Sequence, residues 1–600
     1  MSKVKRLPKR SQVKAEDTWD LSNLFASDAE WDKRFKSFER KITGYEKFRG
    51  KLGDSAASLA SCLKFDSEVS RVAERLYTYA GLKTTEDQAN STYQGLMARM
   101  QNVGTRADEA SSFIRPEILS ISSAKMNKFL AAKELKPYQL QLERLLRFKK
   151  HTLSDKEEEL LAGQGEMADA ANNAFRQLLD SDMKFGVIED ENGAQVELTN
   201  ATLGQLLQAP KRSVRKTAFH QYYEQFVGHE NTLAATLAGS IHKDVYYAKA
   251  RNYESALEAA VYPDNVPQTV YDNLIKAVRK HLPAVHHYLD VRRRKMKLRD
   301  IHHYDTYVPI LSELKTRHTW KQAVKVIIGA LEPLGDEYCS VLEQGLSGRW
   351  CDRYPNKGKQ SGAFSWGVYD SDPYILMNYK PNVLSDVFTL AHEAGHSMHT
   401  HLSVKNQPYE YYHYKIFVAE VASTFNEELL SHYMLDRAPD DRHRAYLINT
   451  EIDDIRATII RQTMFAEFEK ITHEMAEAGE PLTVQSFKDV YQKLLKDYFG
   501  DNFKLDDELS LECLRIPHFY RAFYVYKYAT GLSAAIALSQ RVLKGGKQEL
   551  NNYLGFLKGG CSKFPLDLLR DAGVDMEKPK PVETALKHFT KLVKELDELI

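Results

Sequence analysis

Leu390–His399 has the sequence LAHEAGHSMH and lies in a stretch without proline. On an α-helix, residues four apart lie on the same face, so His392 and His396 can both point at one ion. Neutral imidazoles suit Zn²⁺, and a catalytic zinc ion takes three protein ligands and leaves one position for water. Glu393, next to the first histidine, can accept a proton from that water. The stretch therefore predicts a helix that supplies two zinc ligands and a general base.

The pentapeptide is not decisive by itself. With 20 histidines in 600 residues, the pattern H-E-x-x-H arises by chance in roughly one such chain in twenty. The alternative is two ordinary helix histidines beside a surface glutamate. The longer pattern with a third histidine fails here, because His399 stands where glycine is required and Leu402 where histidine is required. A carboxylate on a following helix is the other source of a third ligand.

Such a carboxylate occurs in the apolar stretch Ile416–Glu428, which is expected to be helical. Glu420 stands there between alanine and valine, and a carboxylate in an apolar stripe is costly unless a cation compensates it. The metal would be that cation, although a buried arginine or lysine is the alternative. Glu427 lies seven residues later on the same stripe and could orient a ligand histidine. The expected metal ligands are thus His392, His396 and Glu420.

The composition is that of a folded protein without an excess of either charge. Apolar residues make up 43% of the chain and charged residues 28%, and the formal net charge is +1. This balance gives no reason to expect nucleic acid or an anionic membrane as a partner. The five cysteines are far apart, and neither a secretory signal nor a spanning apolar run is evident. We therefore expect a cytoplasmic protein without disulfides.

Most of the sequence has helical periodicity, for example in Tyr138–Leu146 and from Ile452 to Phe468. Strands are expected at Met183–Val187 and Val196–Leu198 around an Asn-Gly turn, and at Ser361–Val368 and Tyr374–Tyr379. A boundary is expected near residue 198, and a final amphipathic helix follows Pro581. The basic run Arg292–Lys295 is interpreted as a solvated helix face rather than an anion site.

Beyond the zinc motif, several further segments lead to a family resemblance. These segments are Trp19–Leu24, Ala250–Ala259, His303–Pro309, Ser361–Ser365, Asp386–His399, Ile516–Tyr520 and Tyr528–Gly531. With them, the chain resembles the M3 family of zinc metallopeptidases, and within it the oligoendopeptidase F group.

The resemblance implies a mainly α-helical, two-lobed, clam-like enzyme with a small β-sheet at the active-site channel. We assign residues 1–197 to an N-terminal helical lobe and residues 198–600 to the catalytic domain. It also implies one zinc ion per chain and cleavage of internal bonds in short unstructured peptides. The strand at Gly362–Val368 could offer its backbone to an extended substrate. Nothing indicates an oligomeric state.

The family also places a histidine and tyrosines from a late segment over the zinc. The matching residues here are His518, Tyr524 and Tyr528, and a phenol near the metal can donate a hydrogen bond to a developing oxyanion. A spacing of four predicts that the two tyrosines share one helix face. Tyr520 and Tyr526 are rivals. The match is incomplete, because mammalian-type relatives have a further tyrosine where this chain has Gly531.

The mechanism expected from these residues is hydrolysis by a zinc-bound water. Zinc would lower the pKa of the water and polarise the carbonyl. Glu393 would move the proton to the leaving amine, while His518, Tyr524 and Tyr528 steady the oxyanion. Two other functions are considered: a dipeptidyl carboxypeptidase-like exopeptidase, and a helical binding scaffold without catalysis.

Overall fold

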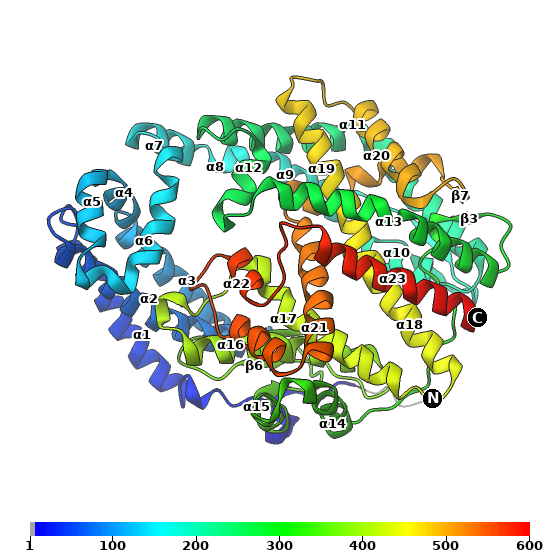
Figure 1. Cartoon of the computed structure of the whole chain (residues 1–600), viewed down its shortest axis with the longest axis horizontal. Helices are drawn as coiled ribbons and strands as arrows, with labels where there is room; N and C mark the ends of the chain where they lie inside the picture. Colours follow the sequence, from blue (N-terminus) through cyan, green and yellow to red (C-terminus); the bar gives the residue numbers. More distant parts are fainter. Residues whose placement is uncertain (1–5) are drawn as a thin grey trace. The chain divides into compact units, whose positions relative to one another are not determined.

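The computed structural model describes residues 6–600, and most of them are helical (Figure 1). The few strands are two or three residues long. The predicted fold class, mainly α with a small β-sheet, is confirmed. The described chain divides into two compact units, each made of three chain segments.

Of the described residues, the first unit comprises 6–150, 315–433 and 538–573. Its helices pack on long side chains spaced three or four apart, as in α1, which buries Trp31, Phe35, Phe38 and Ile42. The elements that lie wholly or mainly in this unit are α1 (Asp28–Ile42), α2 (Ala56–Glu86), α3 (Ser91–Ser111), α4 (Ile114–Ser120), α5 (Ser123–Leu130), α6 (Gln139–Leu146), α14 (Trp320–Leu331), α15 (Asp336–Ser347), β4 (Cys351–Asp352), β5 (Phe364–Trp366), β6 (Tyr374–Leu376), α16 (Ser385–Asn406), α17 (Ile416–Asp436) and α22 (Pro565–Asp571).

The second unit comprises residues 151–314, 434–537 and 574–600. Helix α21 (Tyr526–Leu557) begins in this unit, ends in the first, and contains a non-helical residue at Gly546. The other elements of the second unit are α7 (Asp155–Gly163), α8 (Gly165–Ala168), α9 (Ala170–Gln177), β1 (Val187–Glu189), β2 (Gln195–Glu197), α10 (Asn200–Leu207), α11 (Arg212–Ala250), α12 (Ala256–Val261), α13 (Gln268–Lys295), β3 (Ile301–His302), α18 (Asp441–Ile455), α19 (Arg461–Glu477), α20 (Val484–Phe499), β7 (Phe503–Lys504) and α23 (Lys580–Leu599).

The predicted domain boundary after residue 197 lies inside the second unit and stays a prediction. The predicted final helix is present as α23. The helix predicted from Ile452 to Phe468 is interrupted, because a π-helical turn at Arg456–Ile460 separates α18 from α19.

Both predicted strand pairs are present, but their strands are shorter than expected, and the first pair is also displaced. β1 begins at Val187, the last residue of the strand predicted at Met183–Val187, and β2 ends at Glu197, one residue before the predicted end. β1 and β2 pair antiparallel, with Ile188 opposite Val196. β5 and β6 also pair antiparallel, with Ser365 opposite Ile375. The sequence did not indicate β4, which pairs parallel with the other side of β6 and makes the strand order β4-β6-β5. β5 is therefore an edge strand.

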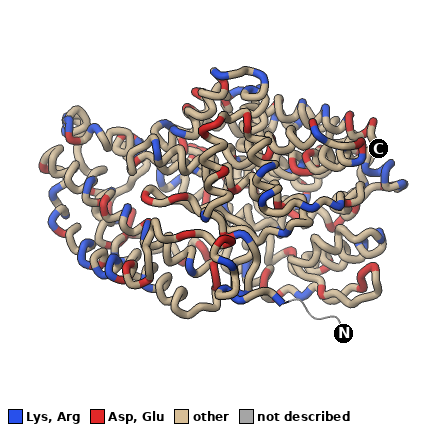
Figure 2. The backbone as a smooth tube through the Cα atoms, turned by 90° about the horizontal axis from the view of Figure 1, so that it is seen from below, with Lys and Arg blue, Asp and Glu red and all other residues tan. Residues whose placement is uncertain are grey.

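Positively and negatively charged residues are interspersed along the backbone, in keeping with the net charge of +1 (Figure 2). Among residues 6–600, no helix has both the length and the apolar character needed to cross a membrane.

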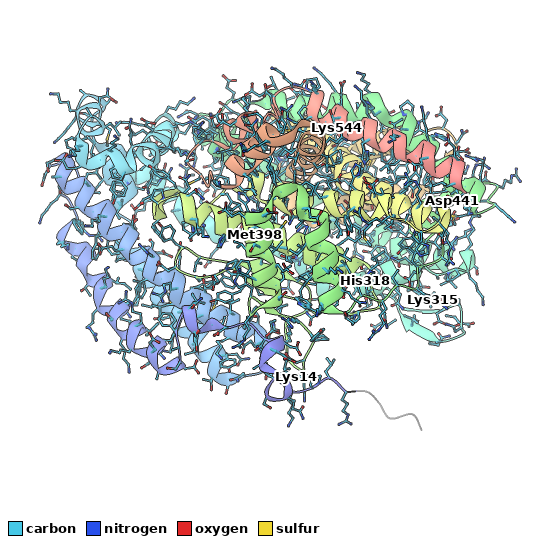
Figure 3. The ribbon with its side chains drawn as sticks, turned by 60° about the horizontal axis from the view of Figure 1, so that its bottom comes forward. Lys14, Lys315, His318, Met398, Asp441 and Lys544 are labelled. Carbon is cyan, nitrogen blue, oxygen red and sulfur yellow. The ribbon has the colours of Figure 1, made fainter. Side chains whose placement is uncertain are left out.

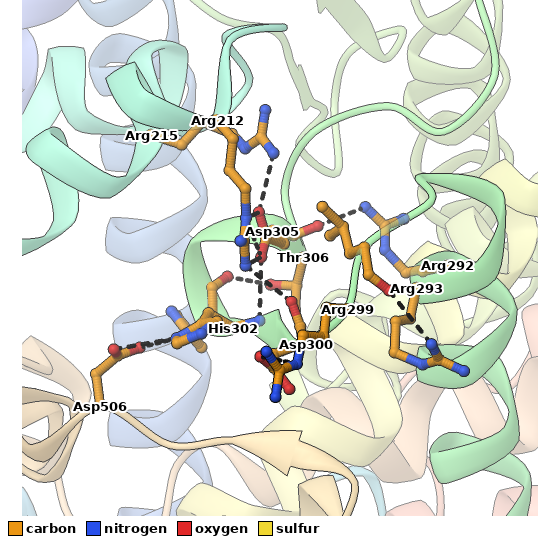
Figure 4. Close-up of polar contacts among 12 residues, drawn as sticks. Arg212, Arg215, Arg292, Arg293, Arg299, Asp300, His302, Asp305, Thr306 and Asp506 are labelled. Atoms are coloured by element: carbon orange, nitrogen blue, oxygen red, sulfur yellow. Dashed lines mark hydrogen bonds and ion pairs between the residues drawn. The ribbon is translucent and has the colours of Figure 1, made fainter.

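A buried ion network in the second unit explains the segment His303–Pro309 (Figure 4). Asp305 is fully buried and accepts hydrogen bonds from Arg212 and from Arg215, the latter at 2.9 Å and 2% exposed. Burial would raise the pKa of Asp305, but these two guanidinium groups hold it below its ordinary value. A buried carboxylate is tolerated here because cations of the protein compensate it.

Arg292 corrects the interpretation of the basic run as a solvated face (Figure 4). Its side chain is 1% exposed, and it donates to the carbonyl oxygens of Asp305 at 3.2 Å and Val308 at 2.6 Å. Arg293 and Arg294 pair instead with Asp290. The sequence could not separate these three arginines, because only the fold decides which one faces the loop.

The burial of His303, in the same segment, lets us predict how the free energy of unfolding depends on pH. Burial lowers its pKa to about 3, whereas an unfolded histidine titrates near 6.5. The neutral His303 side chain therefore makes its full contribution to the free energy of unfolding above pH 6.5. This contribution is lost as the pH falls towards 3. Between pH 7 and pH 5 this loss is about 2 kcal/mol.

The variant His303→Phe keeps a ring that contacts Tyr307 and Phe499 but removes the titrating group. We expect its midpoint of urea unfolding to fall less between pH 7 and pH 5 than that of the wild type. Between pH 7 and pH 8.5 the two proteins should change in parallel. Equal falls below pH 7 would contradict the prediction.

Candidate metal centre

Helix α16 carries the histidine pair because its opposite face is apolar. Val387, Leu390, Ala391, Ala394 and Met398 are fully buried, at the spacing of one helix face. Figure 3 labels Met398 on this helix. The predicted helix through the zinc motif is therefore present. The ring centroids of His392 and His396 lie 4.9 Å apart.

Three candidate ligands converge on one point. Nε2 of His392 and Nε2 of His396 lie 3.3 and 3.4 Å from Oε2 of Glu420. Donor atoms that bind one tetrahedral ion at about 2.0–2.1 Å lie about 3.3 Å apart. Two imidazoles and one carboxylate are also a donor set that zinc accepts. The residues thus fit a tetrahedral metal site in both chemistry and spacing.

Two further side chains of α17 hold the site. Oε2 of Glu427 lies 3.2 Å from Nδ1 of His392, on the side of the ring away from Glu420. Ser423 donates a hydrogen bond to the Glu420 carboxylate at 3.0 Å. Partners of this kind fix the tautomer and orientation of a ligand histidine. The predicted orienting position of Glu427 agrees with this geometry, whereas Ser423 was not expected.

The site strongly favours positive charge. Burial alone would lower the pKa of His392, but hydrogen bonding to Glu420 and Glu427 raises it to about 10. The pKa of Glu420 is lowered despite its burial, since both histidines hydrogen-bond to it. Both ion-pair partners of Glu420 are histidines rather than the arginine or lysine of the alternative interpretation. A cation bound between these residues would be stabilised by the same electrostatic potential.

Glu393 and His399 differ from the three converging residues. Glu393 is 7% exposed, and burial raises its pKa despite the two neighbouring histidines. His399 is buried, stacks on Tyr414 at 3.7 Å, and has a pKa lowered to about 3 by burial. Glu393 therefore lies beside the three converging residues without being one of them, whereas His399 is a packing residue.

Gly395 is the site residue that sequence reasoning missed. A Cβ at this position would lie 2.5 Å from the carbonyl oxygen of Ala422 and 2.6 Å from Cα of Ser423. Glycine therefore lets α16 and α17 approach closely, and Asn426 bonds across this contact to the carbonyl of Ala391 at 3.2 Å. Glycine inside a helix costs about 1 kcal/mol relative to alanine. A glycine within the predicted helix could therefore have indicated a close contact at this position.

The late-segment residues gather within the second unit. The ring centroid of His518 lies 6.5 Å from that of Tyr524 and 6.0 Å from that of Tyr528, and the two tyrosine rings are 5.4 Å apart. The rivals Tyr520 and Tyr526 are buried at 6% and 0% exposure. Burial and the neighbouring Arg521 lower the pKa of His518.

The predicted shared helix face is wrong for Tyr524. Helix α21 begins at Tyr526, so Tyr528 is helical but Tyr524 lies in the turn before it. The two rings still meet, because the turn brings Tyr524 back towards the first turn of the helix.

Comparisons with known proteins show the family to which this chain is similar. The profile of peptidase family M3 matches residues 205–588, and a profile described as oligopeptidase F matches residues 117–185. The oligopeptidase PepF of Bacillus subtilis (strain 168) is 45% identical over 599 residues, which cover 100% of this chain and 89% of the relative.

Two crystal structures extend the match to the fold. A protein from Chlamydophila abortus has a TM-score of 0.94 and 36% identity, and the match covers 99% of this chain and 100% of that one. Oligoendopeptidase-F from Enterococcus faecium has a TM-score of 0.74 and 35% identity, with 95% and 99% covered.

Gly395→Ala tests the close contact between the two helices. The added methyl group meets backbone atoms that cannot rotate away, so α16 and α17 must separate and Glu420 must withdraw from the histidines. We expect at least a tenfold weaker metal affinity, since misplaced ligands or their supports typically cost about 10–100-fold. Competition with a chromogenic chelator measures it.

Gly204→Ala in α10 is the matched control, because nothing lies within 4 Å of its added Cβ. It should bind metal like the wild type and be equally or more stable. Unchanged metal affinity in Gly395→Ala would show that the close contact is not required.

Proposed function

The chain belongs to peptidase family M3 and is a metalloendopeptidase of the oligoendopeptidase F group, and from this premise we propose that it uses zinc to cleave internal bonds of short, unstructured peptides. The observation that carries the proposal is the convergence of His392, His396 and Glu420 at the spacing of a tetrahedral zinc site. Family membership implies a metal cofactor and peptide substrates. The identity of the metal, its ligands and the substrate class are our proposals.

His392, His396 and Glu420 would hold the ion, and Glu427 would orient His392. When bound there, zinc lowers the pKa of a water ligand and polarises a carbonyl group. The carboxylates compensate the ion, and the ion removes the cost of placing Glu420 among apolar side chains.

Glu393 acts as the general base in this proposal. It accepts a proton from the attacking water and delivers that proton to the leaving nitrogen as the C–N bond breaks, so that the nitrogen departs as an amine and Glu393 returns to its ionised form. Burial raises its pKa, which favours the uptake of the proton that it then transfers. No covalent acyl-enzyme forms.

His518, Tyr524 and Tyr528 donate hydrogen bonds to the oxyanion of the tetrahedral intermediate. Their support is the family resemblance, the mutual proximity of the three rings, and the partial exposure of both tyrosines. Removing one such donor typically lowers kcat by about 10²–10³-fold.

β5 is the proposed backbone partner of an extended substrate. It is the edge strand of its sheet, and Ser365 on β5 hydrogen-bonds to Ser397 on α16 at 2.8 Å. A peptide that adds to this edge would lie along the helix of the histidine pair. Main-chain pairing is independent of side-chain identity, so it suits peptides of varied sequence.

Glu393→Gln tests the role of the base. The amide keeps the size of the side chain but cannot accept the proton, so we expect kcat/KM to fall at least about 100-fold. Zinc stoichiometry, measured by mass spectrometry of the metal, should remain near one per chain. Glu410→Gln, on the loop between α16 and α17, is the control and should retain activity. A fully active Glu393→Gln variant would refute the mechanism.

Cleavage mapping tests the substrate class. Short peptides with both ends blocked should be cut at internal bonds, and a folded protein should be spared. A chelator should abolish both activity and bound metal, and added Zn²⁺ should restore them. Cleavage restricted to peptides with a free C-terminus would instead identify the exopeptidase, and activity that survives complete metal removal would exclude the zinc mechanism.

A further inference from the structure

Phe523, which precedes Tyr524, has an unusual backbone conformation. Its φ angle is +55°, in the left-handed region that bulky side chains rarely adopt. Among residues 6–600, three other non-glycine residues have positive φ: Asn252, Asn265 and Lys297. Phe523 is the aromatic member of this set.

The other three residues follow the end of a helical segment, where the chain's own backbone stabilises the turn. Their N–H groups donate to the carbonyl three residues earlier: Asn252 to Lys249 at 3.1 Å, Asn265 to Tyr262 at 3.0 Å, and Lys297 to Arg294 at 3.0 Å. Phe523 differs, because its N–H donates to Oε1 of Glu469 at 2.9 Å. Its turn is held by a carboxyl group 54 residues earlier in the chain.

Glu469 is built into the interior of the second unit. It lies on α19, is 1% exposed, and accepts the Phe523 N–H within the protein core. Burial raises its pKa well above the ordinary value, because a buried carboxylate loses its hydration. Glu469 has no role in the catalytic mechanism proposed above.

The ring of Phe523 is clamped by the same helix. Its centroid lies 4.5 Å from that of His473, one turn after Glu469 on α19, and 5.9 Å from that of Tyr271 on α13. Backbone and side chain of Phe523 are thus both fixed by elements outside the segment 518–528.

The turn determines where Tyr524 lies. Immediately after Phe523, the carbonyl of Tyr524 accepts the N–H of Lys527 at 3.2 Å, and α21 starts at Tyr526. This arrangement places the Tyr524 ring 5.4 Å from Tyr528, while the guanidinium of Arg521 lies 4.1 Å from its centroid. Tyr528 is fixed by its helix, whereas Tyr524 depends on the turn.

We propose that Glu469 is a positioning residue for peptide hydrolysis: by accepting the Phe523 N–H it holds the left-handed turn that places Tyr524 beside Tyr528 and His518. This inference rests on the proposed function of Tyr524 at the oxyanion. Glu469 itself touches neither substrate nor metal in this scheme.

Two substitutions of similar size separate hydrogen bonding from packing. Glu469→Gln keeps a carbonyl oxygen that accepts the N–H, whereas Glu469→Met removes the acceptor. We expect Glu469→Met to lower kcat about 10- to 100-fold, as a catalytic group displaced by about 1 Å does, with KM changed less than about threefold. Glu469→Gln should rescue kcat, and zinc content should be unchanged in both variants.

Thr463→Val is the control for damage to α19. Thr463 is fully buried on the same helix, and its hydroxyl group donates to the carbonyl of Ile459, in the preceding π-helical turn, at 2.7 Å. Its kcat should match the wild type. If Glu469→Met does not fold, Glu469→Asp replaces it, because the shorter side chain withdraws the acceptor while keeping the chemistry. Its kcat should then fall although that of Glu469→Gln does not.

A double-mutant cycle with Tyr524→Phe identifies the residue through which Glu469 acts. If Tyr524 mediates the effect, Glu469→Met should lower kcat less than about threefold in the Tyr524→Phe background. Full additivity, a wild-type kcat for Glu469→Met, or equal loss in Glu469→Met and Glu469→Gln would overturn the inference while leaving the role of Tyr524 intact. A wild-type kcat for Tyr524→Phe would instead overturn the proposed function of that tyrosine.

Discussion

The close contact between α16 and α17 is the constraint on which the candidate metal site depends. His392 and His396 are placed by helical spacing alone, but Glu420 reaches them only because Gly395 admits the backbone of Ala422 and Ser423. A helical glycine costs about 1 kcal/mol relative to alanine. That cost is offset when the helices meet, because three donor atoms then lie at the distances a tetrahedral ion requires. Gly395, which is unfavourable within a helix, therefore stands at the position where the site requires close helix packing.

Two buried carboxyl groups, Asp305 and Glu469, and the partly exposed Glu420 show three ways of limiting the cost of a carboxylate charge in one protein. Asp305 is ionised and paired with arginines, so its charge is balanced within the protein. Glu469 lies in the core, and burial raises its pKa well above the ordinary value, which disfavours its charged form. Glu420 is ionised and faces two imidazoles, which are metal ligands by chemistry, together with the hydroxyl group of Ser423. A cation bound beside Glu420 would therefore compensate its negative charge.

The sequence predicted the parts of the structure that local patterns determine. The 3.6-residue period identified the helices, the spacing of His392 and His396 gave two donors, and an isolated glutamate in an apolar helix indicated Glu420. The antiparallel strands β5 and β6 followed from their turn. The parallel strand β4 did not, because two residues carry no periodicity and a parallel partner lies far away in sequence.

Tyr524 shows why the remaining errors have a tertiary origin. Its spacing from Tyr528 indicated one helix face, and the two rings are indeed neighbours. They are neighbours for another reason, because the chain turns through a left-handed Phe523 instead of continuing as a helix. No residue within the segment 518–528 specifies that turn, whose acceptor is supplied by Glu469 on α19. Arg292 is a similar case, since its burial depends on a loop that follows α13.

The two tyrosines consequently differ in how firmly the fold fixes them. Tyr528 lies in the first turn of a long helix, so its position follows from the packing of α21. Tyr524 is fixed by one buried hydrogen bond to the preceding residue and by the packing of the Phe523 ring. A helix tolerates the loss of one contact, because the hydrogen bonds of neighbouring turns still hold its backbone. A left-handed aromatic residue instead reverts to an ordinary backbone conformation once the interactions that hold it are removed. Substitutions on α19 can therefore alter the placement of Tyr524 without touching the segment that contains it.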